Sequence, residues 1–288
     1  SVIKIQKIET ILNRGNSEYL ENGDFVKEEG NSTILAVCDS FSKPYNKKDN
    51  PIVLFDGLSS GEIVKNIFFS TVKKSEPSDS LLGITQKADK AIGEFQKKAG
   101  FPFQADNLAG LTFAIAKVNE SQIEILQGGD CIALWKNKDG STEFTPNSVL
   151  AASKYVRKAF SDLMQEYRGD RNEARAKFTP ILMEEKRKNI NQNHPEAYPV
   201  MNGQLNISLC YETTLNVNDA KMLILFADGL IPFQWFDDNE KMKELMTIIE
   251  ENGLSYQLRK YREEQTSGKT AKDIAPFPEA AAVAVSFR

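Results

Sequence analysis

The sequence predicts an α+β fold in which antiparallel sheets are covered by helices. Short apolar runs typical of strands occur near both ends and in the middle of the chain, and several are joined by turn signals. Pairs of amphipathic segments with helical spacing lie between these runs. Strands in meanders with paired helices between them favour antiparallel sheets with helices on their outer faces. At 288 residues the chain is long enough to bury a sizeable core, and we expect one domain over 1–288.

The first 40 residues are predicted to form three strands. Val2–Ile8 alternates apolar and polar residues, as a half-buried strand does. Glu21–Asp24 indicates a turn, after which Asp24-Phe-Val leads into a second strand. Thr33–Cys38 is a continuous apolar run and predicts a buried third strand, and the polar, proline-containing stretch Ser42–Pro51 predicts a surface loop.

Two helices are expected next. Apolar residues recur at helical spacing over 60–72 and 79–99, and the candidate N-caps are Ser59 or Ser60 for the first helix and Ser78 or Asp79 for the second. Strands are then predicted over 110–117, 122–126, 131–136 and 142–144, with a hairpin turn over 137–140.

Residues from about 148 to 202 change in character. Lysine, arginine and glutamate become dense there, and apolar residues recur at helical spacing: Val156, Phe160, Leu163, Met164 and Tyr167. This pattern predicts a helical insertion packed on the sheet. Its charged side is interpreted as a solvated helix face, with recognition of a partner as the alternative.

The C-terminal third is predicted to return to strands and then to end on one. Strands are expected over 204–210 and 221–227, helices over 239–251 and 254–264, a loop over 266–278 and a buried strand over 280–287.

Composition excludes several function classes. A formal net charge of −4 gives no electrostatic basis for binding nucleic acid or an anionic membrane. We expect no membrane span, because the chain has no run of about 18 apolar residues. The three scattered cysteines favour reduced thiols and a cytoplasmic protein. The single histidine, His194, excludes a multi-histidine zinc site and is expected in a solvated loop.

Three apolar runs each end on an aspartate, at Asp39, Asp130 and Asp228. A carboxylate at the end of a buried strand is costly to desolvate unless a cation or a good donor meets it. Clustered carboxylates in a chain with one histidine suit Mg²⁺ or Mn²⁺, so a metal-assisted reaction is the first hypothesis. A second Asp-Gly pair, Asp56-Gly57, also follows an apolar run and competes with Asp39, although it is equally typical of a turn.

The order of several short motifs resembles the type-2C, metal-dependent Ser/Thr protein phosphatases over essentially the whole chain. The motifs are Asn22-Gly-Asp24-Phe, Leu35-Ala-Val-Cys-Asp39-Ser40, Gly61-Glu-Ile-Val-Lys, Gly110-Leu-Thr112-Phe-Ala, Gln127-Gly-Gly-Asp130-Cys and Leu225-Phe-Ala-Asp228-Gly229-Leu. The resemblance implies an α-β-β-α sandwich of two antiparallel sheets flanked by helices. It also implies hydrolysis of phosphoserine or phosphothreonine in proteins by a metal-activated water, and therefore a phosphoprotein substrate.

The resemblance further implies a set of site residues around two ions of Mg²⁺ or Mn²⁺. Asp39 would bridge the two ions and Asp228 would bind one, which makes these two the catalytic residues. Asp24 would bind a metal through water, and the carbonyl of Ser40 would face one of the ions. Asp130 and Thr112 would lie near a third, weaker metal position, and Gly229 lies beside Asp228. Glu279 is the nearest substitute for the last metal-binding aspartate.

The chain also departs from the family's pattern. Gly23 stands where the family has glutamate, Ser40 replaces the usual glycine, and Tyr19 or Leu20 falls where a phosphate-binding arginine is usual. Pro278 stands where the last metal-binding aspartate is expected, which leaves Glu279 or Asp273 for that role. These departures support an alternative: a catalytically weak or inactive pseudophosphatase that acts as a protein-binding regulatory module. A nucleotide- or sugar-phosphate hydrolase is a third hypothesis, although the chain has no P-loop.

Overall fold

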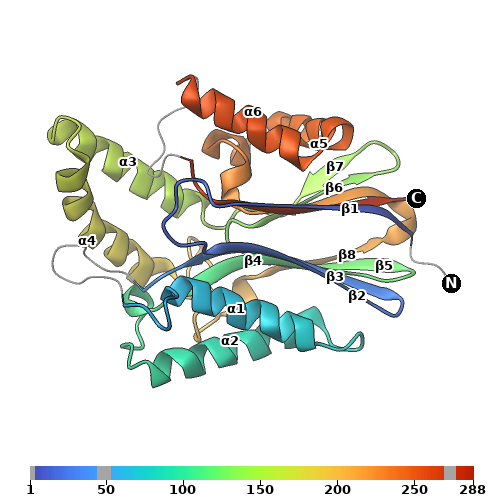
Figure 1. Ribbon diagram of the computed structural model, residues 1–288, viewed down its shortest axis with the longest axis horizontal. Helices are drawn as coiled ribbons and strands as arrows, with labels where there is room; N and C mark the ends of the chain where they lie inside the picture. The colour runs from blue at the N-terminus through green and yellow to red at the C-terminus, as the bar shows by residue number, and fades with distance from the viewer. Residues whose placement is uncertain (1–3, 44–52, 269–276) are drawn as a thin grey trace.

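Two five-stranded antiparallel sheets lie face to face, and helices cover both outer faces (Figure 1). The computed structural model describes residues 4–43, 53–268 and 277–288. The first sheet has the order β1-β10-β9-β6-β7, with β1 Ile5–Asn13, β10 Ala280–Phe287, β9 Ala220–Phe226, β6 Ile132–Asn137 and β7 Thr142–Phe144. The second has the order β2-β3-β4-β5-β8, with β2 Asn22–Glu29, β3 Ser32–Phe41, β4 Gly110–Val118, β5 Gln122–Gly128 and β8 Tyr211–Asn216. The predicted α-β-β-α sandwich is confirmed.

Each sheet is covered by one helix pair. The helices α1 Ser60–Lys74 and α2 Leu81–Lys98 pack on the second sheet, and α5 Asn239–Asn252 and α6 Leu254–Thr266 pack on the first (Figure 1). A separate core fills the space between the sheets. No helix within the three described ranges is long and apolar enough to cross a lipid bilayer.

The strands β3 and β4 are buried on both faces, which explains their continuous apolar sequences. Leu35 and Val37 belong to the core between the sheets, whereas Ile34 and Ala36 face the α1–α2 layer. Each fully buried leucine, isoleucine or valine side chain of this kind contributes roughly 1.5–3 kcal/mol. Alternation along β3 therefore places Asp39, two residues after Val37, on the inner face at the end of the sandwich.

The insertion forms a helical hairpin of α3 Leu150–Glu166 and α4 Arg171–Asn189, with a small core of its own around Phe160 and Phe178. It projects from the end of the sandwich opposite to the two chain termini (Figure 1). The C-terminal end of α4 joins the body through an apolar cluster that includes Ile190, Tyr198 and Phe41.

Several local expectations were wrong. Asn22–Asp24 is the start of β2 and not a turn, because these residues pair in register with β3. Residues 204–210 form a loop and a short 3₁₀ turn, and the strand β8 follows at Tyr211; its largely exposed, polar sequence lacks the apolar run used for the prediction. The N-cap of α2 is Ser80. The predicted loops over 42–51 and 266–278, and the start of the first strand, lie partly outside the described residues.

Candidate metal centre

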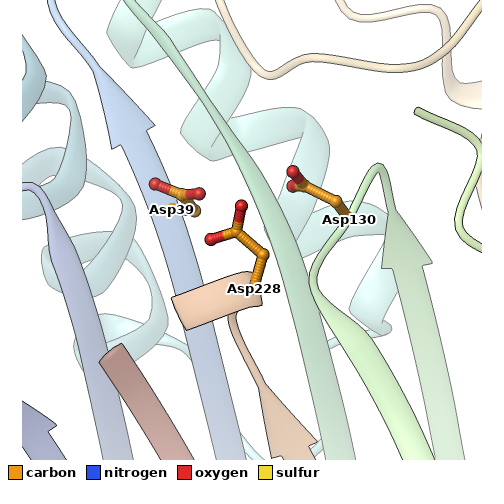
Figure 2. Close-up of side chains that lie close together, drawn as sticks. All are labelled: Asp39, Asp130 and Asp228. Atoms are coloured by element: carbon orange, nitrogen blue, oxygen red, sulfur yellow. The ribbon is translucent and has the colours of Figure 1, made fainter. Parts of the chain in front are cut away.

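Three aspartates from separate segments of the chain lie close together (Figure 2). Asp39 lies near the end of β3, Asp130 in the turn between β5 and β6, and Asp228 two residues after the end of β9. One carboxylate oxygen from each residue lies within 4.8 Å of the others, and each residue keeps partial contact with solvent. The convergence predicted for these three residues is therefore present.

Register and hydrogen bonding hold Asp130 beside Asp39. In the β3–β4 ladder, Thr112 is the direct partner of Asp39, so both side chains lie on the inner face. The Thr112 hydroxyl donates to the Asp130 carboxylate at 2.7 Å. Gly129 has φ +87°, and a Cβ atom there would lie 2.3 Å from Thr112 Cγ2, so only glycine allows this turn to approach Thr112.

A close approach of two backbone segments positions Asp228. The amide of Ala227 donates to the carbonyl of Ala281 at 2.9 Å, which ties the end of β9 to β10. The next turn begins at Asp228, and a Cβ atom on Gly229 would lie 1.7 Å from the Glu279 carbonyl oxygen. Glycine at this position therefore allows the turn that carries Asp228 to pass beside the chain leading into β10.

The electrostatics of the cluster favour a bound cation. Burial raises the pKa of Asp39 well above its usual range, and the charges of Asp228, Asp130 and Glu279 raise it further. Burial also raises the pKa of Asp130, and the Thr112 hydrogen bond and the charge of Arg157 partly oppose this. Converging carboxylates of this kind are stable as anions only when positive charge is added, and their oxygens are the ligands that Mg²⁺ and Mn²⁺ prefer. The residues present therefore fit the implied metal.

No protein-family model and no curated protein matches the sequence. The Ser/Thr phosphatase Stp1 from Staphylococcus aureus is similar in structure, with a TM-score of 0.58 and 14% identity over 100% of this chain and 97% of Stp1. A bacterial serine phosphatase has a TM-score of 0.56 and 13% identity over 98% of each chain. The catalytic domain of the Ser/Thr phosphatase PstP, in complex with two manganese ions, has a TM-score of 0.55 and 15% identity over 98% of this chain and 97% of that domain.

The chain has the type-2C phosphatase fold. The resemblance found in the sequence is thus confirmed at the level of the fold.

Two residues predicted from that resemblance lie beside the cluster and not in it. Asp24 is the partner of Val37 in the β2–β3 ladder, two residues farther from the site end than Asp39, and burial alone raises its pKa. The residue directly opposite Asp39 is Asn22, which sequence reasoning missed. Asn22 belongs to the quoted Asn22-Gly-Asp24 motif, but only the strand register shows which member of the motif faces Asp39.

Glu279 lies just before β10, so strand alternation does not set its direction. Its Oε1 atom accepts hydrogen bonds from the amides of Glu21 at 2.5 Å and Asn22 at 3.1 Å. Its charge contributes to the raised pKa of Asp39, so its carboxylate lies near the cluster. The other candidate for the missing ligand, Asp273, lies outside the described residues.

Ser40 and Asp56, two residues singled out in the sequence, both have side chains outside the acidic cluster. Ser40 is buried on the opposite face of β3 from Asp39, and its hydroxyl lies 3.8 Å from Cys38 Sγ, so its side chain does not enter the acidic site. Asp56 has φ +50° in an exposed turn closed by the Phe55–Leu58 bridge. It is therefore a turn residue and not a member of the cluster.

Neither the thiols nor the histidine is suited to act as a nucleophile or base here. Burial raises the pKa of Cys38 to about 12, and burial together with the charges of Asp130 and Asp39 raises the pKa of Cys131 well above its usual range. Both thiols are therefore protonated at neutral pH. His194 hydrogen-bonds the Lys188 carbonyl at 2.9 Å in the loop after α4.

Two charged residues near the site were missed. The carboxylate of Glu21 lies at the N-terminus of α1, where it accepts hydrogen bonds from Ser42 Oγ at 2.5 Å and Ser59 Oγ at 3.0 Å. Lys186, near the end of α4, contributes a positive charge that interacts with Glu21 and Asp39. Neither residue carries a sequence signal, because tertiary packing alone brings them to the cluster.

Proposed function

We propose that the protein hydrolyses phosphoserine or phosphothreonine in protein substrates with the help of Mg²⁺ or Mn²⁺. The observation that carries the proposal is the group of three carboxylate oxygens within 4.8 Å of one another, from Asp39, Asp130 and Asp228. Two further facts support it: the fold is shared with solved Ser/Thr phosphatases, and one of these, PstP, was solved with two manganese ions.

In this proposal Asp39 and Asp228 hold the metal and Asp130 adds a third carboxylate. A bound divalent ion would lower the pKa of water and stabilise negative charge on a phosphoryl group. Thr112 keeps its proton directed at Asp130, which leaves the remaining carboxylate lone pairs for other contacts. The protonated thiols of Cys38 and Cys131 supply no competing nucleophile.

Metal titration tests this proposal directly. Mg²⁺ and Mn²⁺ are titrated by calorimetry into protein treated with a chelator, and turnover of p-nitrophenyl phosphate and of a phosphothreonine peptide is followed in parallel. We expect metal binding and metal-dependent turnover. Absence of turnover with bound metal would contradict the catalytic proposal, and absence of binding at millimolar metal would contradict the metal site itself.

One observation favours the second candidate function, a pseudophosphatase that acts by binding a protein partner. Glu279, the candidate for the missing ligand that lies within the described part of the chain, already accepts hydrogen bonds from two backbone amides. A metal site with one carboxylate fewer binds more weakly, and a fold of this kind is able to be retained for recognition. Turnover that stays absent at saturating metal would favour this alternative.

A further inference from the structure

The insertion brings a lysine to the edge of the acidic cluster. The ammonium of Lys186, near the end of α4, lies 3.7 Å from the centroid of the Phe41 ring. Phe41 follows Asp39 by two residues on β3, so alternation places both side chains on the same face of the strand. Lys186 therefore approaches the site from the side of the insertion.

The side chains of the residues on either side of Lys186 form hydrogen bonds or ion pairs with residues outside α4. Glu185 accepts hydrogen bonds from Tyr198 Oη at 2.7 Å and Asn189 Nδ2 at 3.2 Å. Arg187 forms an ion pair with the buried Asp106 at 3.5 Å. These contacts on both neighbours hold the backbone of Lys186 in place, as is needed for a side chain that positions a ligand.

Apart from the Phe41 ring, the ammonium of Lys186 has no close partner among the described residues. Within the described part of the chain it makes no hydrogen bond and no ion pair within 4.0 Å. Burial lowers the pKa of Lys186 to about 8. The charges of Glu185, Glu21 and Asp39 act in the opposite direction, because they favour the ammonium form. Burying a cation without a close counter-ion is costly, and the cost is recovered when an anion binds beside it.

Other cations near the cluster have roles already. Lys65 Nζ donates to the Leu20 carbonyl at 2.5 Å. The guanidinium of Arg157, on α3, lies 4.0 Å from the centroid of the Phe233 ring and interacts with Asp130. A phosphoryl dianion that approaches three carboxylates needs positive charge from the protein as well as from the metal. The ammonium of Lys186, which makes no hydrogen bond within the described part of the chain, has N–H donors for it.

We propose that Lys186 binds the phosphoryl group of the substrate at the metal-loaded cluster, so that the insertion supplies the phosphate-binding cation. This inference rests on the proposed function, because it assumes a phosphorylated substrate. It gives the helical insertion a direct part in substrate binding.

The test compares Lys186→Met with Lys188→Met, which removes an exposed lysine two residues away on the same helix. Binding of inorganic phosphate to the Mn²⁺-loaded protein is measured by calorimetry, together with kcat and KM for a phosphothreonine peptide. We expect Lys186→Met to weaken phosphate binding by about tenfold or more and to raise KM, because a charge-assisted hydrogen bond is lost. Lys188→Met should match the parent protein, and Lys186→Arg should recover part of the affinity.

The outcomes separate this inference from the proposed function. Phosphate binding that depends on Lys186, without any turnover by the parent protein, would reject the catalytic proposal and keep the inference. Equal phosphate affinity in Lys186→Met and the parent would overturn the inference, as would failure of the parent to bind phosphate. Tighter Mn²⁺ binding in Lys186→Met with unchanged phosphate affinity would make Lys186 a counter-ion of the carboxylates and would also overturn it. Lys186→Gln, checked by thermal unfolding, replaces Lys186→Met if the latter fails to fold.

Discussion

Thr112 and Asp130 are joined by a hydrogen bond of 2.7 Å that links the start of β4, the central strand of the second sheet, to the β5–β6 turn. Because Thr112 is also the ladder partner of Asp39, one side chain sets the position of one candidate metal ligand relative to another. The site is therefore organised by strand register as well as by the carboxylates themselves.

Replacing Thr112 by valine should weaken metal binding. The change keeps the side-chain volume but removes the donor that lowers the pKa of Asp130 and orients its carboxylate. A hydrogen bond to a charged group contributes roughly 1.5–3 kcal/mol, so we expect a loss of about tenfold or more in Mn²⁺ affinity by calorimetry. Thr112→Ser keeps the hydroxyl and serves as the control; equal affinities in the two variants would show that this hydrogen bond does not matter for the site.

Asp39→Asn should abolish metal-dependent turnover and stabilise the metal-free protein at neutral pH. The first effect follows from loss of the central ligand, and we expect turnover to fall by at least about a thousandfold. The second follows because a buried carboxylate beside like charges is replaced by a neutral amide. Turnover and urea unfolding in chelator measure the two effects. Asp56→Asn, in an exposed turn, is the matched control and should change neither.

The metal-free protein should lose stability as pH rises. The pKa of Asp39 is higher in the folded state than in the unfolded chain, so the folded state binds more protons between the two values and the slope of unfolding free energy against pH is negative. We expect the gap in unfolding free energy between Asp39→Asn and the parent, measured in chelator, to widen from about pH 4 upward through the folded pKa. Saturating Mg²⁺ should close or reverse this gap, because it stabilises the parent and not the variant that lacks the central ligand. A gap independent of pH would contradict the raised pKa.

Gly229→Ala should destabilise the protein and disturb the metal site together. The added Cβ atom would lie 1.7 Å from a backbone oxygen of Glu279, which no side-chain rotation relieves. We expect a loss of about 3 kcal/mol or more in unfolding free energy and weaker metal binding through displacement of Asp228. Gly100→Ala, at φ +77° with nothing within 4 Å of the added atom, should cost only about 1–2 kcal/mol and leave metal affinity unchanged.

Glu279→Gln distinguishes a metal ligand from a backbone anchor. Glutamine keeps an oxygen that is able to accept from the amides of Glu21 and Asn22 while removing the negative charge. Because these amides already occupy Oε1, we expect Mn²⁺ affinity to change by less than about threefold, whereas Glu279→Ala should cost about 1–3 kcal/mol in stability. A loss of affinity above tenfold in Glu279→Gln would identify Glu279 as a metal ligand.

Local sequence patterns were sufficient for most of the secondary structure. The helices α1, α5 and α6 and the strands β4, β6, β9 and β10 lie within a few residues of their predicted positions, because apolar periodicity reflects which side of an element is buried. The edge strand β8 and the start of β2 were missed for the same reason: exposed or polar residues carry no such periodicity, and pairing with a neighbouring strand decides their conformation.

The sequence by itself determined which carboxylates end buried strands, and so which three meet. Asp39, Asp130 and Asp228 each follow an apolar run, and the layered packing of two sheets brings such strand ends together. Only the tertiary structure decided that Asn22 faces Asp39, that Glu279 binds backbone amides and that Lys186 reaches the site from the insertion. These facts depend on strand register and on contacts between residues far apart in the chain, which no local pattern encodes.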